Sequence, residues 1–276
     1  MFTLNCKGRL LVVDKPLVMG IINATPDSFF SGSRHEGTDA ILQQAGRMIK
    51  DGAAILDIGG QSTRPGSKKI SVEDELQRVI APVEAIHRNF PGVFISIDTY
   101  YSKVAEEAVA AGACIVNDIS AGSIDQNMIE TVAALQVPYV LMHMQGTPQT
   151  MQQQPTYENV TGEILDFFIN KMDILHKAGI HDIIIDCGFG FGKTVANNFE
   201  LIRNLSVFKM LNAPVLLGVS RKSFIYKTLG LTVEEALNGT TVLNTTGLMN
   251  GATILRVHDV KEAAEAINLF KKCTGS

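Results

Sequence analysis

The stretch DIIIDCGFGFGKT, residues 182–194, joins a β-branched run to an acid, Asp186, and then to alternating glycines and a Gly-Lys-Thr end. An apolar run that ends in a polar residue and glycines is typical of a buried strand followed by a tight loop. The loop looks like a phosphate-binding loop, but that motif requires G-x-x-x-x-G-K-[ST]. Counting back five residues from Gly192 reaches Cys187, and a loop that starts at Gly188 is one residue too short. The spacing excludes a phosphate-binding loop, and we interpret the stretch as one strand and one loop of a repeating unit.

The same unit, an apolar run that ends in polar residues, occurs eight times along the chain. The runs are LVMGIIN (17–23), AAILDIGG (53–60), VFISIDT (93–99), CIVNDIS (114–120), PYVLMHM (138–144), DIIIDCG (182–188), PVLLGVS (214–220) and ATILRVHD (252–259). Each is apolar nearly throughout, as expected of a strand that is buried on both faces of a parallel sheet.

A helical pattern follows each run. The patterns cover residues 38–52, 71–90, 102–112, 125–136, 161–179, 199–211, 233–251 and 260–273. Thr38 is the expected N-cap of the first, and Ser71 with Asp74 three residues later is close to a capping box in the second. This alternation predicts one α/β domain over residues 1–276, a single (β/α)8 TIM barrel. The stretch LNCKGRLLVVDKP (4–16) predicts an N-terminal β-hairpin that covers the barrel bottom. An open doubly wound sheet is the alternative, although it has little need of an eighth unit.

Composition excludes several classes of partner. The net charge of −4 argues against a general nucleic-acid surface, so anionic ligands need local basic residues. No apolar run approaches the ~20 residues of a membrane span, and the N-terminus shows no signal peptide. The four cysteines lie far apart, which favours reduced thiols in a cytoplasmic protein. His176 and His181 resemble metal ligands in spacing, but a solvated turn is the better interpretation.

Polar side chains mark the end of every predicted strand. They are Asn23, Asp57, Asp98, Asn117, Asp118, His143, Asp186, Ser220, Arg221, Lys222, Ser223, Arg256 and His258. In a TIM barrel these ends surround one mouth, where active sites lie. A single polar end can be a helix cap, but a ring of charged groups costs desolvation unless a ligand satisfies it. The ring as a whole therefore predicts a binding site.

The kinds of group divide this site into two parts. Asp98, Asn117 and Asp186 offer acceptors and one amide, which suit a flat heterocycle with several N–H donors. Basic residues follow strands seven and eight, where barrels often bind phosphate. These basic residues are Arg221, Lys222, Arg256 and His258. We expect a heterocycle at the acids and an anion at the bases.

Three loops complete the predicted site. NATPDSFFSGS (23–33), with Asp27, and GGQSTRPGSKK (59–69), with Arg64, are rich in Gly, Ser, Pro and Thr, and together they suggest a lid. Ordinary connections between strand and helix are the alternative. In the third loop, DCGFGFGKT (186–194), glycines let the backbone pass close to a ligand. Phe189 and Phe191 can form apolar walls there, and Lys193 and Thr194 start the next segment.

Eight motifs, in order and at fitting distances, resemble those of the bacterial dihydropteroate synthase family. They are GIINATPDSFF, LDIGGQSTRPGS, IDTYYSKVAEEA, IVNDIS, LMHMQGTPQTMQ, IIIDCGFGFGK, VSRKSF and RVHDV. The resemblance implies condensation of 6-hydroxymethyl-7,8-dihydropterin diphosphate with p-aminobenzoate, giving 7,8-dihydropteroate and diphosphate in folate synthesis. It implies that the C–O bond breaks before the amine arrives, with Mg²⁺ as cofactor and small molecules as substrates. It also implies a homodimer formed through the later helices.

The resemblance also implies roles for individual residues. The pterin would contact Asp98, Asn117, Met142, Asp186, Lys222 and Arg256. The p-aminobenzoate site would consist of Phe29, Thr63, Arg64, Pro65, Phe191 and Ser223. Diphosphate would be held by Asn23, Thr63, Arg256 and His258, and Mg²⁺ by Asn23. The catalytic residues would be Asp27, Lys222, Arg256 and His258.

Two positions depart from the family pattern. Gln61 stands where the motif usually has Glu, and Cys187 stands where it usually has Pro. Neither carries a ligand group in the family. The main alternative function is a pterin-binding domain that presents methyltetrahydrofolate to a corrinoid methyltransferase, but such a domain does not need STRPGS or SRKS to shape an amine site. An aldolase with a Schiff base at Lys222 needs a desolvated, unpaired amine, which the neighbouring Arg221 does not by itself provide. An inactive homologue that only binds partners is also compatible with the pattern.

Overall fold

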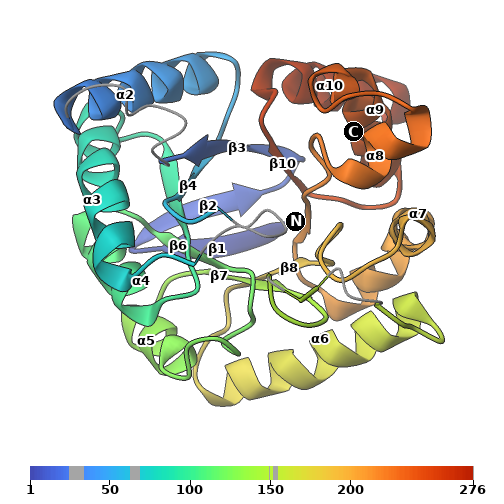
Figure 1. Ribbon diagram of the computed structural model, residues 1–276, viewed down its shortest axis with the longest axis horizontal. Helices are drawn as coiled ribbons and strands as arrows, with labels where there is room; N and C mark the ends of the chain where they lie inside the picture. The colour runs from blue at the N-terminus through green and yellow to red at the C-terminus, as the bar shows by residue number, and fades with distance from the viewer. Residues whose placement is uncertain (25–33, 63–68, 149, 152–154, 276) are drawn as a thin grey trace.

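The computed structural model describes the chain except residues 25–33, 63–68, 149, 152–154 and 276. Its centre is a closed barrel of eight parallel strands in the order β10-β3-β4-β5-β6-β7-β8-β9, and helices surround it (Figure 1). The strands are β3 Leu17–Asn23, β4 Ile55–Gly59, β5 Phe94–Asp98, β6 Ile115–Asp118, β7 Tyr139–Met142, β8 Ile183–Asp186, β9 Val215–Leu217 and β10 Ile254–Val257. The predicted (β/α)8 barrel is confirmed, and each strand lies within its predicted apolar run.

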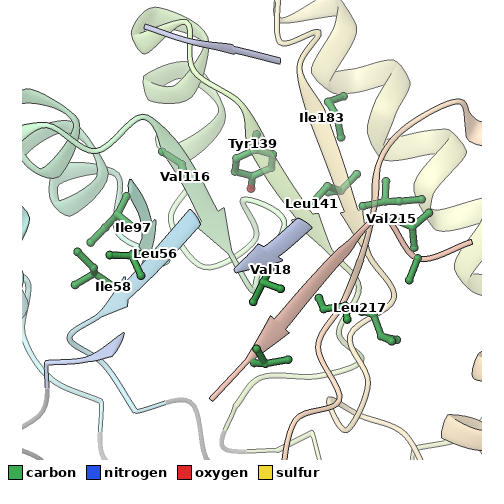
Figure 2. Close-up of a cluster of buried hydrophobic side chains, with 14 of the residues drawn as sticks. Val18, Leu56, Ile58, Ile97, Val116, Tyr139, Leu141, Ile183, Val215 and Leu217 are labelled. Carbon is green, nitrogen blue, oxygen red and sulfur yellow. The ribbon is translucent and has the colours of Figure 1, made fainter. Parts of the chain in front are cut away.

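Two apolar layers hold the barrel together, because alternate side chains of a strand point to opposite faces. In β8, Ile184 belongs to the cluster inside the barrel, whereas Ile183 and Ile185 belong to the layer between strands and helices. Figure 2 shows part of the outer layer, with Leu56 and Ile97 among the side chains from neighbouring strands. Burial on both faces explains why each strand reads as a continuous apolar run.

Except for Ser223–Leu229, which the sequence did not predict, the helices occupy the predicted segments with several shifted boundaries. They are α2 Arg34–Lys50, α3 Val72–Asn89, α4 Ser102–Ala111, α5 Met128–Leu135, α6 Val160–Lys177, α7 Val195–Arg203, α8 Ser223–Leu229, α9 Leu237–Met249 and α10 Val260–Thr274, with short 3₁₀ turns η1 Leu205–Leu211 and η2 Glu234–Ala236. The Ser71 hydroxyl caps α3 by accepting the N–H of Asp74 at 3.1 Å, as predicted. Thr38 is not an N-cap: α2 begins four residues earlier and runs through it. None of the described helices is long and apolar enough to span a membrane.

The N-terminal hairpin, β1 Phe2–Cys6 and β2 Arg9–Val13, closes the amino end of the barrel as predicted. Leu4 and Leu11 pack into the same cluster as the inward-facing strand residues. The Asn5 N–H donates to the Asp182 carboxylate at 2.9 Å, which fixes the hairpin to the start of β8. The hairpin leaves the carboxyl ends of the strands as the open end.

Candidate active site

The carboxyl ends of the strands bring the predicted acids and amide together. The parallel register places Gly59 beside Asp98 and Asp98 beside Asn117. Further around the barrel, Met142 of β7 pairs with Asp186 of β8. The three polar side chains are all buried, with Asp98 8%, Asn117 4% and Asp186 5% exposed. The expected cluster of acceptors and one amide therefore comes from the ends of β5, β6 and β8, of which β5 and β6 are neighbours and β8 is separated from β6 by β7.

Arg256, at the end of β10, reaches across the barrel to this cluster. Its Nε donates to the Asp57 carboxylate at 2.6 Å, and its Nη2 donates to the Asp98 carboxylate at 2.5 Å. The Asn117 amide donates to the same oxygen of Asp57 at 3.0 Å. The sequence had marked Asp57 only as a polar strand end. In the structure, Asp57 orients two of the residues that were predicted to bind the pterin, Asn117 and Arg256.

Burial dominates the electrostatics of these acids. It raises the pKa of Asp98 above its ordinary value, although the Arg256 guanidinium opposes the shift. Burial likewise raises the pKa of Asp186, against the attraction of Lys222. The second oxygen of Asp57 is buried without a hydrogen-bond partner among the described residues. Buried carboxylates that lack donors favour a ligand that brings N–H groups.

Lys222 is half-buried and lies against the loop after β8. Its ammonium donates to the Phe189 carbonyl and lies 4.6 Å from the centre of the Phe191 ring. Burial lowers the pKa of Lys222 to about 8, and Asp186 opposes the shift. The Phe191 ring also packs near Met142. Lys222 and Met142, predicted to contact the pterin, therefore lie close to Phe191, which was predicted for the p-aminobenzoate site.

The glycine-rich loop differs in detail from the prediction. Its close approach is to a neighbouring loop: a Cβ on Gly188 would lie 1.9 Å from the His143 carbonyl oxygen, and one on Gly192 would lie 2.5 Å from that of Gln145. Both glycines have positive φ, which side chains rarely adopt. Phe189 is wholly buried in the core and forms no wall of the site, in contrast to Phe191.

Lys193 and Thr194 have different roles, although both were expected only to start the next segment. Thr194 does so, because it caps α7 in a capping box with Asn197. Lys193 is instead turned inward and only 4% exposed. Burial lowers its pKa to about 7. The composition of the loop gave no sign of this inward orientation.

The other basic strand ends divide between site and scaffold. His258 is exposed, and its Nδ1 lies 3.0 Å from the Ser220 hydroxyl. Arg221, expected among the anion ligands, instead donates twice to the Asp259 carboxylate at 2.8 Å and to two backbone carbonyls. Ser223 is exposed at the first turn of α8, a helix that the sequence did not predict. Asp118 is structural, since it accepts the Tyr139 hydroxyl and two backbone N–H groups.

Five of the predicted site residues lie outside the described residues. They are Asp27, Phe29, Thr63, Arg64 and Pro65. The expected lid loops fall largely within the same two segments. Near the end of α6, the rings of His176 and His181 stack with their centroids 5.6 Å apart.

Asn23 ends β3 and is the predicted magnesium ligand. Its side chain makes no hydrogen bond to a described residue, and within the described part of the chain no three His, Cys, Asp or Glu side chains gather to hold a metal. Mg²⁺ usually keeps several waters and binds through one or two protein ligands together with substrate phosphates. The donor set therefore fits an ion that is held mainly by a diphosphate, with the Asn23 amide oxygen as a protein ligand.

Comparison with known proteins agrees with this geometry. Residues 19–258 match the family model described as pterin binding enzyme. The chain is 44% identical over 267 residues to the dihydropteroate synthase of Escherichia coli strain K12, covering 96% of this chain and 94% of that protein. A crystal structure of the Yersinia pestis dihydropteroate synthase with a sulfonamide drug complex superposes with a TM-score of 0.94, at 39% identity over all of both chains.

A second solved structure contains a small aromatic acid. The Xanthomonas albilineans dihydropteroate synthase with 4-aminobenzoic acid superposes with a TM-score of 0.92, at 38% identity over 99% of this chain and 98% of that one. These matches extend over the barrel and over all the strand ends described above. The chain therefore belongs to the pterin-binding enzyme family and, within it, to the dihydropteroate synthases.

Proposed function

We propose that this protein catalyses the condensation of 6-hydroxymethyl-7,8-dihydropterin diphosphate with p-aminobenzoate, giving 7,8-dihydropteroate and diphosphate in folate synthesis. The observation that carries the proposal is the grouping of Asp98, Asn117 and Asp186 with two cations, Lys222 and Arg256, at one end of the barrel. A pterin edge presents several N–H donors and one carbonyl, and this group offers the complementary acceptors and donors.

The pterin ring would contact buried acids that use only part of their hydrogen-bonding capacity within the described part of the protein. The Asp186 carboxylate accepts only the Gly188 N–H, at 2.8 Å, among the hydrogen bonds of the described residues. A charge-assisted bond from a ring N–H to such a carboxylate is shorter and stronger than a neutral one. Met142 would pack on the ring, and Lys222 would donate to its carbonyl side.

The diphosphate would lie near Arg256 and His258. Two of the three Arg256 nitrogens are engaged by Asp57 and Asp98, while Nη1 makes no hydrogen bond to a described residue. An arginine fixed in this way can present its remaining N–H groups to an anion with little loss of side-chain entropy. His258 directly follows β10 and is exposed. In this proposal it donates to a second oxygen of the diphosphate.

We propose Mg²⁺ as the cofactor, with Asn23 at the end of β3 as its protein ligand. When bound, the ion neutralises diphosphate charge and so makes it a better leaving group. The chain's own contribution is positional. Arg256 holds the anion, the acids hold the ring, and the exocyclic methylene of the pterin is thereby kept between them.

In the proposed reaction the C–O bond between the methylene and the diphosphate breaks first. The bonding electron pair leaves with the diphosphate oxygen, and the electron-rich pterin stabilises the resulting cation. The amine of p-aminobenzoate then attacks the methylene carbon, and the new C–N bond releases one proton. This order requires charge stabilisation more than a strong base, in agreement with a site of acids and cations.

The p-aminobenzoate site would lie beside Phe191 and Ser223, with Phe29, Thr63, Arg64 and Pro65 completing it. The binding of 4-aminobenzoic acid by the Xanthomonas albilineans relative supports this substrate. The half-buried Phe191 ring, close to Lys222, is suited to pack against an aromatic acid.

We also propose that residues 1–276 act as one unit within a cytoplasmic homodimer. Val242 and Met249 of α9 are 55% and 71% exposed, and Leu229 at the end of α8 is 51% exposed. Apolar side chains grouped on the later helices favour a partner surface. All four cysteines are free, and a reducing compartment would keep them so.

The experiment is release of diphosphate that depends on p-aminobenzoate. Wild-type protein with pterin diphosphate and Mg²⁺ should release diphosphate only when p-aminobenzoate is added, with dihydropteroate formed in equal amount. Asp186→Asn should lower the turnover about 100-fold or more, because it weakens a charge-assisted contact. Asp182→Asn is the matched control: it alters the acid at the other end of β8, and its turnover should match wild type. Diphosphate release without formation of dihydropteroate when p-aminobenzoate is present would refute the proposal.

A further inference from the structure

Lys193 makes a set of contacts that the reaction scheme does not use. Its buried ammonium lies 3.0 Å from the carbonyl oxygens of Gly188 and Phe191 and 3.3 Å from that of His143. It also lies 3.1 Å from Nδ1 of His143, whose pKa burial lowers to about 3. The imidazole is therefore neutral near pH 7, and its Nδ1 can accept. An ammonium has three N–H donors, and the four acceptor atoms around Lys193 can accept all of them.

These acceptors belong to two different loops. His143 follows β7, whereas Gly188 and Phe191 follow β8. The two loops are in direct backbone contact, since even a methyl group on Gly188 or Gly192 would overlap the backbone of residues 143–145. The Tyr157 hydroxyl adds a further tie, donating to the Gly192 carbonyl at 2.7 Å. Lys193 is thus a buried side chain whose contacts join the two loops.

The loop held by Lys193 carries two groups of the site. The Phe189 carbonyl accepts from Lys222, and the Phe191 ring faces the same ammonium. Gly190 lies under the Lys222 stem, where a Cβ would be 3.1 Å from Cδ. A shift of residues 188–192 would therefore displace both the aromatic wall and the support of Lys222.

We propose that Lys193 is a positioning residue of the reaction, which fixes the loop 188–192 and, through it, Phe191 and Lys222. The inference rests on the proposed function for its kinetic consequence, and on the described contacts alone for its effect on the loop. Lys193 touches no substrate in this scheme. It acts through residues that do.

The test combines kinetics with hydrogen exchange. Lys193→Met keeps the length of the side chain and removes its donors, and Lys193→Gln restores two of them. Lys193→Met should raise the KM for p-aminobenzoate about tenfold or more, as expected when a binding group is misplaced by part of an ångström. Lys193→Gln should lie between this variant and wild type. The amides of Gly190 and Phe191, which donate to Asn198 and to Gly188, should exchange faster in Lys193→Met.

A double-mutant cycle shows whether the effect passes through the loop. If it does, adding Lys193→Met to Phe191→Ala should change the KM for p-aminobenzoate by less than about threefold, because coupled residues are not additive. Leu4→Ala is the control for lost stability, since Leu4 packs at the opposite end of the barrel and should leave the KM unchanged.

Three results would overturn the proposal: an unchanged KM with unchanged exchange, a full tenfold effect in the Phe191→Ala background, or an equal rise in KM for Leu4→Ala. A wild-type protein without turnover would count against the proposed function instead, and the exchange measurement would still decide whether Lys193 holds the loop.

Discussion

Glu75 of α3 gives the sharpest test of the electrostatics behind the strand ends. Its side chain is 0% exposed, and neither carboxylate oxygen has a hydrogen-bond partner among the described residues. Burial raises its pKa from the ordinary 4.5 to about 8, the nearby Thr99 hydroxyl opposes the shift, and Asp98 adds to it. We therefore expect Glu75→Gln to stabilise the protein in alkaline solution, because the amide never ionises.

The sign and size follow from proton linkage. Between pH 4.5 and about 8 the folded protein keeps a proton that the unfolded chain has lost. The free energy of unfolding then falls by about 1.4 kcal/mol for each pH unit as the pH rises. This contribution is complete below pH 4.5 and is lost once the pH passes about 8. The full interval, 8 minus 4.5, corresponds to about 5 kcal/mol at most, and relaxation around a buried charge reduces this to about 2–4 kcal/mol.

The assay is urea unfolding of wild type and Glu75→Gln at a series of pH values from about 5 to about 8.5. The difference in unfolding free energy should be near zero at the acid end and grow in favour of the variant toward the alkaline end. Asp118 and Asp186 titrate in both proteins, so their contributions cancel in the difference, whereas the interaction of Asp98 with Glu75 is part of the effect that is measured. Glu84→Gln, an exposed change on the same helix, should follow wild type. A difference that stays constant within about 0.5 kcal/mol across this range would show that Glu75 is not held protonated by burial.

Three further predictions concern the site and its supports. Asp57→Asn should lower kcat/KM about 100-fold in steady-state kinetics, because the Arg256 cation loses one of its two buried partners; a change of less than about threefold would remove Asp57 from the site. Arg221→Lys should lower the stability by about 1–2 kcal/mol in thermal unfolding, because lysine cannot bind Asp259 with two parallel bonds. Its KM for both substrates should stay at the wild-type value, and a raised KM would return Arg221 to the anion site. Excess chelator should stop turnover while the pterin ring alone still binds in calorimetry, and turnover that persists would assign Asn23 another role.

The barrel could be predicted because its strands carry two independent signals. Burial on both faces makes each run apolar throughout, and the polar residue at its end marks the open side of the barrel. Closure of the barrel then brings residues that are distant in sequence together, so that the Arg256 Nε lies 2.6 Å from the Asp57 carboxylate. The strand ends therefore predicted that Asp98, Asn117, Asp186 and Arg256 surround one mouth, but not that Arg256 pairs with Asp57 and Asp98.

The direction in which a side chain leaves its strand could not be predicted. Arg221 and Lys222 are adjacent bases, yet one binds Asp259 and the other the loop after β8. The difference arises because Arg221 has φ +54°, a left-handed conformation that a non-glycine residue rarely adopts. Lys193 is similar, since nothing in the pattern GFGKT distinguishes a lysine in water from one surrounded by carbonyls.

The buried acids of the site lower the stability of the protein without ligand, and this has a functional consequence. Burial raises the pKa of Asp98 and Asp186, and one oxygen of Asp57 has no partner among the described residues. Each of these groups is costly in the free protein and would be satisfied by a ligand that brings N–H donors. If each acid were fully paired within the protein, the arrangement would be more stable, but few carboxylate oxygens would remain to accept N–H groups of a pterin. Arg256 shows the compromise: it neutralises Asp57 and Asp98 while Nη1 is left for an anion, so one side chain stabilises the acids and prepares the site for the diphosphate.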